Sequence, residues 1–318
     1  MEENKKTTTY IGGQAVIEGV MMRGKTMYAM AVRNGEGEIV LEKTKLNAAI
    51  TDKAFFKLPI VRGVVSFLSS LVGGTKILMR SAEIAGEDIG QDDEPSKFEQ
   101  WLLDKLGDKF NDILIYFSVA LSVVLGVGLF FMLPTVIGNF FKPLVPVWFL
   151  GVIEGVLRLV IFLIYIVLVS RMKEIQRVFQ YHGAEHKTIN CFESGEDLTV
   201  ENVKKHTRLH KRCGTSFLFL VMAVSMVVFI FVRVDTLWLR LLSRILLVPV
   251  VSGLSYEVLR WAGRSKSKLV DIVSFPGLCI QKMTTAEPDD KQIETAIAAM
   301  KGVLEDEHEY TDCSACGA

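Results

Sequence analysis

One uncharged segment constrains the fold of this chain more than any other feature of its sequence. Residues 113–135 read ILIYFSVALSVVLGVGLFFMLPT and contain no charged side chain. An α-helix needs about 20 apolar residues to cross roughly 30 Å of bilayer hydrocarbon, so this segment is long enough. Three more apolar segments follow at 149–170, 215–232 and 237–259. We therefore expect a mainly α-helical protein whose four transmembrane helices lie in a lipid bilayer.

The charges of the connecting segments predict the orientation of these helices. Nine Lys and Arg lie between Arg171 and Arg212, whereas the connection after the first segment carries Lys142 and the one after the third carries Arg233. Since loops rich in Lys and Arg stay in the cytosol, we expect a multi-pass protein of the plasma membrane with both termini and the segment 171–214 in the cytosol. The N-terminus lacks the apolar core of a signal peptide, and five cysteines without a disulfide pattern suit a reducing compartment.

The sequence indicates three regions. Residues 1–96 are expected to form a small N-terminal α+β module in the cytosol, which ends in an acidic linker. Residues 97–264 hold the four-helix membrane region with a cytosolic His-rich loop at 171–214, and residues 265–318 form a cytosolic helical segment and tail.

The N-terminal module contains one predicted hairpin and one predicted helix. β-favouring residues at 27–33 and 38–44 flank the turn sequence Asn34-Gly35-Glu36-Gly37, which predicts two antiparallel strands. Apolar residues from 61 to 82 recur at helical spacing, and this helix either lies on the inner membrane face or covers the sheet. Residues 12–24 are punctuated by glycine but follow no strand and open no clear helix, so they are not a dinucleotide-binding fingerprint.

The strongest chemical signal is a cluster of histidines beside the membrane-length segments. Residues 182–186 read HGAEH, which matches the inverted zincin pattern H-x-x-E-H. Histidines four residues apart share one face of a helix, so His182 and His186 can point two nitrogens at one ion. In this pattern the glutamate, here Glu185, serves as the general base that activates water.

A second group of ligand types follows about twenty residues later. His206 and His210 are also four residues apart, and Cys213 comes just before the third apolar segment. Imidazole and thiolate bind zinc-class divalent ions, so we expect His182, His186 and one of His210 or Cys213 as ligands. Three protein ligands would make a catalytic site and four a structural one, and the sequence favours neither. His206 on a basic helix could instead face anionic lipid head groups.

Several carboxylates are further candidates for this site. Glu257 lies at the inner end of the fourth segment, where an ionisable side chain is costly without a partner. Glu287, Asp289 and Asp290 could hold a cation or complete the histidine site. Asp289 with Gln292 also makes a capping box, so helix initiation is the simpler explanation of this acidic group.

Four charged residues lie in the second and fourth apolar segments. Glu154 and Arg158 are four residues apart, which suggests either a polar opening in the membrane or, more simply, an internal ion pair. Arg240 and Arg244 begin the fourth segment, and we expect both to reach outward to the membrane surface.

The chain resembles the YqhQ-like family (DUF1385) of bacterial membrane proteins, an uncharacterised family described as predicted metal-dependent enzymes. The matching stretches are GGQAVIEGVMMRG at 12–24, YHGAEHKTINCFE at 181–193, HKRCGTSF at 210–217 and TTAEPDD at 284–290. The resemblance covers almost the whole chain except its Cys-containing tail. It implies that the motif positions are Glu18, His182, Glu185, His186, His210, Cys213, Glu287, Asp289 and Asp290.

These observations support three hypotheses about function. The first is a metal-dependent hydrolase, with zinc held by the histidine cluster, which acts on a membrane-associated peptide or lipid-linked substrate. The second is a non-enzymatic membrane scaffold or assembly factor in which zinc is structural. The third is a solute or ion transporter that uses Glu154, Arg158 and Glu257. The 36 basic and 36 acidic residues balance, so nothing favours nucleic acid as a partner.

Overall fold

The computed structural model of this protein describes residues 11–46, 58, 60–86, 109–210, 213–232, 234, 236–264 and 267–315. The chain divides into two compact units, each assembled from segments that are far apart in the sequence. The first unit contains residues 1–87, 166–220 and 252–318, and the second contains 88–165 and 221–251. The acidic linker expected before residue 97 lies outside the described residues.

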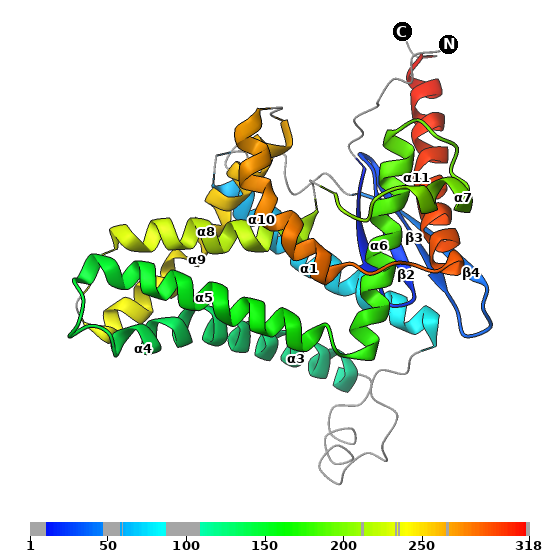
Figure 1. Cartoon of the computed structure of the whole chain (residues 1–318). Helices are drawn as coiled ribbons and strands as arrows, with labels where there is room; N and C mark the ends of the chain where they lie inside the picture. The colour runs from blue at the N-terminus through cyan, green and yellow to red at the C-terminus, as the bar shows by residue number, and fades with distance from the viewer. Residues whose placement is uncertain are drawn as a thin grey trace. The chain divides into compact units, whose positions relative to one another are not determined.

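The first unit is built on a four-stranded antiparallel sheet in sequence order (Figure 1). Its strands are β1 (Gly12–Val16), β2 (Gly19–Arg23), β3 (Met27–Arg33) and β4 (Ile39–Lys45). The predicted hairpin is confirmed, since β3 pairs with β4 from Met27 opposite Lys45 to Arg33 opposite Ile39. The hairpin of β1 and β2 was not predicted. Its two-residue turn needs a positive φ of 50° at Glu18.

The two faces of this sheet are covered by different helices. Val20, Met22, Ala29 and Ala31 face a core that includes α6 (Lys173–Glu193) and α11 (Asp290–Ala315). The alternate residues Val16, Met21, Met30 and Val32 pack against Ile77 and Ile84 of α1 (Val61–Ala85). This alternation follows the two-residue period of a strand. The described part of the first unit is therefore a sheet between two helical layers.

Helix α1 contacts the sheet with its C-terminal half and another helix with its N-terminal half. A Cβ atom on Gly63 would lie 2.9 Å from the Cα of Gly253 in α9 (Leu237–Arg264), so the two backbones pack closely. Near this contact Arg62 forms an ion pair with Glu257. The sequence left open whether this helix lies on the inner membrane face or covers the sheet. In the structure its C-terminal half covers the sheet.

Among the described residues, four helices are long and apolar enough to cross a membrane: Val61–Ala85, Phe117–Asn139, Phe149–Val169 and Leu237–Trp261. The last three correspond to the first, second and fourth segments expected from the sequence. The third expected segment forms α8 (Gly214–Phe231), whose apolar stretch Phe217–Phe231 is shorter than the four candidates. Helix α1 is an additional candidate for a membrane-crossing helix, which the sequence analysis did not count among the four segments.

The second unit consists of helices. It contains α3 (Lys109–Val127), a π-helical turn (Gly128–Met132) and α4 (Leu133–Asn139), together with most of α5 (Val147–Val169), the end of α8 and the start of α9. The π-helical turn lies just before Pro134, which has no N–H for the helix ladder.

The His-rich segment expected as a loop is mostly helical. It forms α6 and then α7 (Val200–Lys205), and α6 packs on the sheet. The predicted C-terminal helix is confirmed, with Ile293, Ile297 and Met300 buried in the core and the capping box formed. It follows α10 (Lys268–Thr284).

Candidate metal centre

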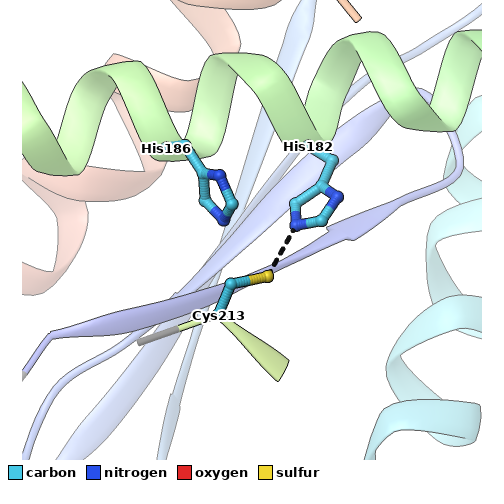
Figure 2. A group of neighbouring side chains, drawn as sticks. All are labelled: His182, His186 and Cys213. Carbon is cyan, nitrogen blue, oxygen red and sulfur yellow. Dashed lines mark hydrogen bonds between the residues drawn. The ribbon is translucent and has the colours of Figure 1, made fainter. Parts of the chain in front are cut away.

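Two histidines of α6 and one cysteine come together in the first unit. His182 and His186 lie one turn apart on the helix, with ring centroids separated by 4.4 Å. Cys213 precedes α8, and its Sγ lies 3.1 Å from His182 Nε2 (Figure 2). One ligand atom of each of the three residues lies within 4.8 Å of the other two. The structure therefore brings together three of the four candidate ligands named from the sequence.

Backbone carbonyls fix the orientation of both imidazole rings. His182 Nδ1 lies 2.9 Å from the carbonyl oxygen of Thr284, and His186 Nδ1 lies 2.6 Å from that of Arg208. A carbonyl oxygen can only accept a hydrogen bond, so each Nδ1 carries a proton. In a neutral ring Nε2 is then the nitrogen with the lone pair for a ligand. Metal-binding histidines are oriented in this way, with the second ring nitrogen donating to a carbonyl or carboxylate.

The arrangement leaves one buried nitrogen without a partner. His186 Nε2 is buried and makes no hydrogen bond of normal geometry, although the Cys213 thiol lies close enough to act on the ring. Burial also lowers the pKa of His186, which keeps the ring neutral. A buried polar atom without a partner is costly, and a bound cation would satisfy it. Two imidazole nitrogens with a thiolate are a donor set that suits zinc-class ions, so the residues fit such a metal.

A glycine inside the motif allows the Thr284 carbonyl to reach His182. A Cβ atom on Gly183 would lie 2.1 Å from the carbonyl oxygen of Ala286, in the connection between α10 and α11. That connection is attached to α6 by a hydrogen bond of 2.8 Å from the Ala286 N–H to the Phe179 carbonyl. The glycine therefore couples the HGAEH motif to the distant TTAEPDD motif.

Glu185 lies on α6 between the two histidines and faces the sheet. A Cβ atom on Gly13 of β1 would lie 2.7 Å from the Glu185 carboxylate, so a side chain at this strand position would displace Glu185. Burial raises the pKa of Glu185 to about 7, against the opposing effects of His182 and of the Gly13 backbone hydrogen bond. A carboxyl group with this pKa exchanges protons readily near neutral pH. Glu185 does not belong to the group of three ligand atoms.

His210 is a neighbour of this group and not a member of it. Its ring centroid is 5.7 Å from that of His186, and its Nε2 lies 3.6 Å from a carboxylate oxygen of Glu193. The Gln281 side chain holds its backbone, since it accepts from the His210 N–H at 2.9 Å and donates to its carbonyl at 2.8 Å. Of the two alternatives for a third ligand, Cys213 is the one that lies with His182 and His186.

The other carboxylate candidates have different partners. Glu18 forms an ion pair with Arg177 and accepts a hydrogen bond of 3.2 Å from the Tyr181 hydroxyl. Glu257 pairs with Arg62. Both belong to contacts between elements of the first unit and not to the group of three.

The acidic residues before α11 likewise serve the fold. Glu287 lies 2.8 Å from Lys187, and Asp290 lies 2.5 Å from Lys204. Asp289 caps the helix, since its carboxylate accepts from the Gln292 N–H at 2.8 Å. Helix initiation was the simpler of the two explanations that the sequence analysis gave for these residues, the other being that they hold a cation.

A second group of ligand types lies at the end of α6. Atoms of Cys191, Glu196 and His206 lie within 4.8 Å of one another. Burial raises the pKa of the Cys191 thiol to about 11, and its Sγ lies 3.7 Å from the Asp197 carbonyl. Cys191 therefore stays a protonated thiol within the hydrophobic core, and it is a poor metal ligand.

Comparison with known proteins places these motifs in a wider group. Residues 58–306 match the model of the family DUF1385, described as a protein of unknown function. The chain is 36% identical over 310 residues to the uncharacterized protein YqhQ of Bacillus subtilis strain 168, which covers 96% of this chain and 95% of that protein. No solved structure matches the chain. These descriptions support the family resemblance and assign neither a metal nor an activity.

Proposed function

Since this chain belongs to the DUF1385 family, whose description assigns no function, we propose from its site that it is a membrane-bound, metal-dependent hydrolase. His182, His186 and Cys213 would hold one zinc-class divalent ion. The observation that carries this proposal is the buried His186 Nε2, which has no hydrogen-bond partner and lies beside two other ligand atoms. The substrate would be a membrane-associated peptide or a lipid-linked molecule.

The number of ligands favours catalysis over a structural role. Catalytic zinc sites use three protein ligands and keep a fourth position open, whereas structural sites are closed by four. Among the described residues the group has three members, and the nearby His210 ring nitrogen lies 3.6 Å from Glu193. A bound ion in such a site supplies Lewis-acid chemistry, because it polarises a substrate oxygen and makes water more acidic.

Glu185 is the residue that we assign to proton transfer. It lies on α6 next to His186, and burial raises its pKa to about 7. A carboxylate with this pKa can take a proton from attacking water and return it to the leaving group at neutral pH. His182 and His186 would keep their orientation throughout, because the Thr284 and Arg208 carbonyls hold their Nδ1 protons.

The position of Cys213 supports a substrate at the membrane surface. Cys213 directly precedes Gly214, the first residue of the apolar helix α8. The nine Lys and Arg between residues 171 and 212 favour the cytosolic face for this part of the chain. A substrate anchored in the inner leaflet would bring its polar part to this level.

A structural zinc site in a membrane scaffold is the second candidate. It is favoured by the Glu185 carboxylate facing Gly13 of the sheet, and by His210, whose ring lies 5.7 Å from that of His186. In that case Glu185 would stabilise the fold, and rotation of His210 would close the coordination shell. Glu185→Gln separates the two candidates, because only the hydrolase depends on proton transfer by this side chain.

Metal analysis of the full-length protein in detergent tests the proposal. We expect about one divalent ion per chain, as a single three-ligand site requires. The ion should be lost in His182→Ala/His186→Ala and retained in Glu185→Gln and in the matched control His206→Ala. A wild-type protein without stoichiometric metal, or a double variant that retains it, would contradict the proposal.

Thiol reactivity gives a second readout that does not depend on knowing the substrate. Cys213 should resist maleimide while metal is bound and react after chelation, because a coordinated thiolate is protected. The exposed Cys279 is the internal reference and should react equally in both conditions. Modification of Cys213 in the metal-loaded protein at the rate of the exposed Cys279 would exclude it as a ligand.

A further inference from the structure

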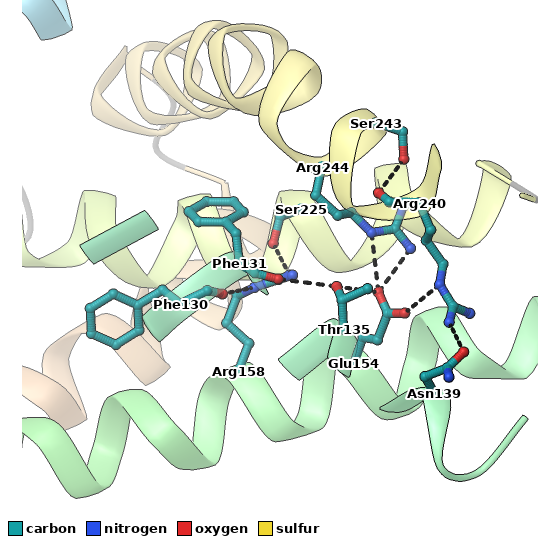
Figure 3. A network of polar contacts seen from close by, with 10 residues as sticks. All are labelled: Phe130, Phe131, Thr135, Asn139, Glu154, Arg158, Ser225, Arg240, Ser243 and Arg244. Atoms are coloured by element: carbon teal, nitrogen blue, oxygen red, sulfur yellow. Dashed lines mark hydrogen bonds and ion pairs between the residues drawn. The ribbon is translucent and has the colours of Figure 1, made fainter. Parts of the chain in front are cut away.

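The second unit contains a group of charged residues buried among apolar helices. Glu154 and Arg158 of α5 and Arg240 and Arg244 of α9 are 0%, 1%, 2% and 1% exposed (Figure 3). Arg240 and Arg244 were expected to reach outward to the membrane surface, and their burial shows that this expectation was wrong. Among the described residues of this group, three guanidinium groups face one carboxylate, so these four side chains carry two excess positive charges in an apolar surrounding.

The single carboxylate is used by the two arginines of α9. Glu154 Oε2 accepts hydrogen bonds from Arg244 Nη2 at 2.8 Å and Nε at 3.1 Å. Glu154 Oε1 lies 3.6 Å from Arg240 Nε. The internal ion pair that was expected to hold helices together therefore forms between Glu154 of α5 and the two arginines of α9. Among the described residues, Arg158 has no ion pair.

Arg158 has only neutral partners in the described part of the unit. Its Nε donates to the Phe130 carbonyl at 2.6 Å and its Nη1 donates to the Ser225 hydroxyl at 2.7 Å. Phe130 lies four residues before Pro134, which has no N–H to offer that carbonyl. The guanidinium also stacks on the ring of Phe229, 4.9 Å from its centroid. These contacts orient the side chain but do not neutralise its charge.

Each of the three guanidinium groups keeps a buried nitrogen without a hydrogen-bond acceptor. These nitrogens are Arg158 Nη2, Arg240 Nη1 and Arg244 Nη1. The groups lie close together, because Arg244 stacks on the same Phe229 ring at 4.1 Å and shares Glu154 with Arg240. A buried charge that is only partly paired is strongly unfavourable, so this group would attract an anion.

We propose that Arg158, Arg240 and Arg244 form a binding site for a phosphate-type oxyanion within the membrane-spanning unit. Two excess positive charges match an anion with one or two negative charges. The planar guanidinium fork suits the several oxygens of a phosphate better than it suits a spherical halide. Glu154 holds the two α9 arginines in place and leaves their outer nitrogens for the ligand. The phosphate could belong to a phospholipid head group or to free inorganic phosphate, and the site is independent of the metal centre.

Thermal unfolding of the full-length protein in extensively washed detergent tests the site. The additions are inorganic phosphate, chloride at equal ionic strength, phosphatidylglycerol, and a diacylglycerol with the same acyl chains but no phosphate. We expect the melting temperature to rise with inorganic phosphate or phosphatidylglycerol and to be unchanged by chloride or diacylglycerol. A rise with inorganic phosphate identifies the free anion as a ligand, and a rise with phosphatidylglycerol alone identifies the lipid. Either result supports the proposal.

Variants of one arginine connect the effect to the site. In Arg158→Gln the apparent affinity for the active phosphate compound should fall about 10- to 100-fold, because one charge-assisted hydrogen bond is lost. Arg158→Lys keeps the charge without the fork and should lie between this variant and the wild type. Arg171→Gln removes an exposed arginine and should bind as the wild type does.

Three results would overturn the proposal. The first is a wild-type protein that neither phosphate compound stabilises. This result would contradict the proposed site even if Arg158→Gln does not fold. The second is equal stabilisation by chloride or by diacylglycerol. The third is an Arg158→Gln variant that responds to phosphate as the wild type does and is itself more stable, which would mean that the excess charge stays uncompensated.

Discussion

The glycine between the two histidines of the candidate metal centre cannot carry a side chain without moving the site. In Gly183→Ala the new methyl group would meet the Ala286 carbonyl oxygen at 2.1 Å, and this backbone atom can only shift with its whole segment. We expect a loss of stability of about 1–3 kcal/mol from overpacking. Metal affinity should fall about 10- to 100-fold, because the Thr284 carbonyl would release His182 Nδ1. Metal titration and thermal unfolding measure the two effects.

Gly73→Ala is the matched control for this prediction. Gly73 lies in α1, and a Cβ atom there would have nothing within 4 Å. The control should bind metal as the wild type does and be slightly more stable, since alanine favours a helix over glycine by about 0.5–1 kcal/mol. Unchanged metal affinity in Gly183→Ala would show that the Thr284 carbonyl does not orient His182.

The two histidines of the candidate site could be identified from the sequence because their spacing is local. His182 and His186 share a helix face in any α-helix, so only the helix had to be recognised. The partners of their rings could not be predicted, because the Thr284 and Arg208 carbonyls belong to the backbone, which every residue has. The choice between His210 and Cys213 depended on contacts with Glu193 that no local pattern encodes.

At the scale of elements, the C-terminal helix begins at a capping box that can be tested by one substitution. The Asp289 carboxylate accepts from the Gln292 N–H, and the Gln292 side chain accepts from the Asp289 N–H. Asp289→Ala should cost about 0.5–2 kcal/mol, the usual loss for an N-cap. It should lower the melting temperature of the full chain without changing its metal content.

Asp290→Ala is the comparison for this helix start. Asp290 makes an exposed ion pair with Lys204, and such pairs contribute about 0–1 kcal/mol. The loss in Asp290→Ala should therefore be smaller than in Asp289→Ala. Equal losses would mean that charge near the helix start matters and the cap itself does not.

Elements with a regular local pattern were predictable, and those that depend on a distant partner were not. Strands β3 and β4 are rich in β-favouring residues around an Asn-Gly turn, and the structure confirms them. The hairpin of β1 and β2 contains Gly12, Gly13 and Gly19, which lower strand propensity. Gly19 is required because a Cβ atom there would lie 2.3 Å from the Ala31 carbonyl, a contact invisible in the sequence.

At the scale of the whole molecule, hydropathy predicted the membrane character but not the grouping of segments. The length of an apolar segment can be read directly from the sequence. Three of the expected spans are therefore found among the helices that are long and apolar enough to cross a membrane. The core of the first unit combines β2 and β3 with α6 and α11, and each of these helices lies more than a hundred residues after the strands. Such pairings depend on complementary surfaces, and the same limit explains why the buried arginines of α9 were expected to face outward.

The orientation of the chain in the membrane is the prediction that belongs to this scale. Nine Lys and Arg between residues 171 and 212 oppose a single Lys142 in the connection between α4 and α5, so the former should be cytosolic. In a Cys313→Ser/Cys316→Ser background, an impermeant maleimide added to inside-out vesicles should label the exposed Cys279. In right-side-out vesicles it should label Leu144→Cys, a position 77% exposed in that connection, and leave Cys279 unlabelled. The reverse pattern would place the metal centre outside the cytosol, where oxidation would compete for the Cys213 thiol that the proposed hydrolase needs as a ligand.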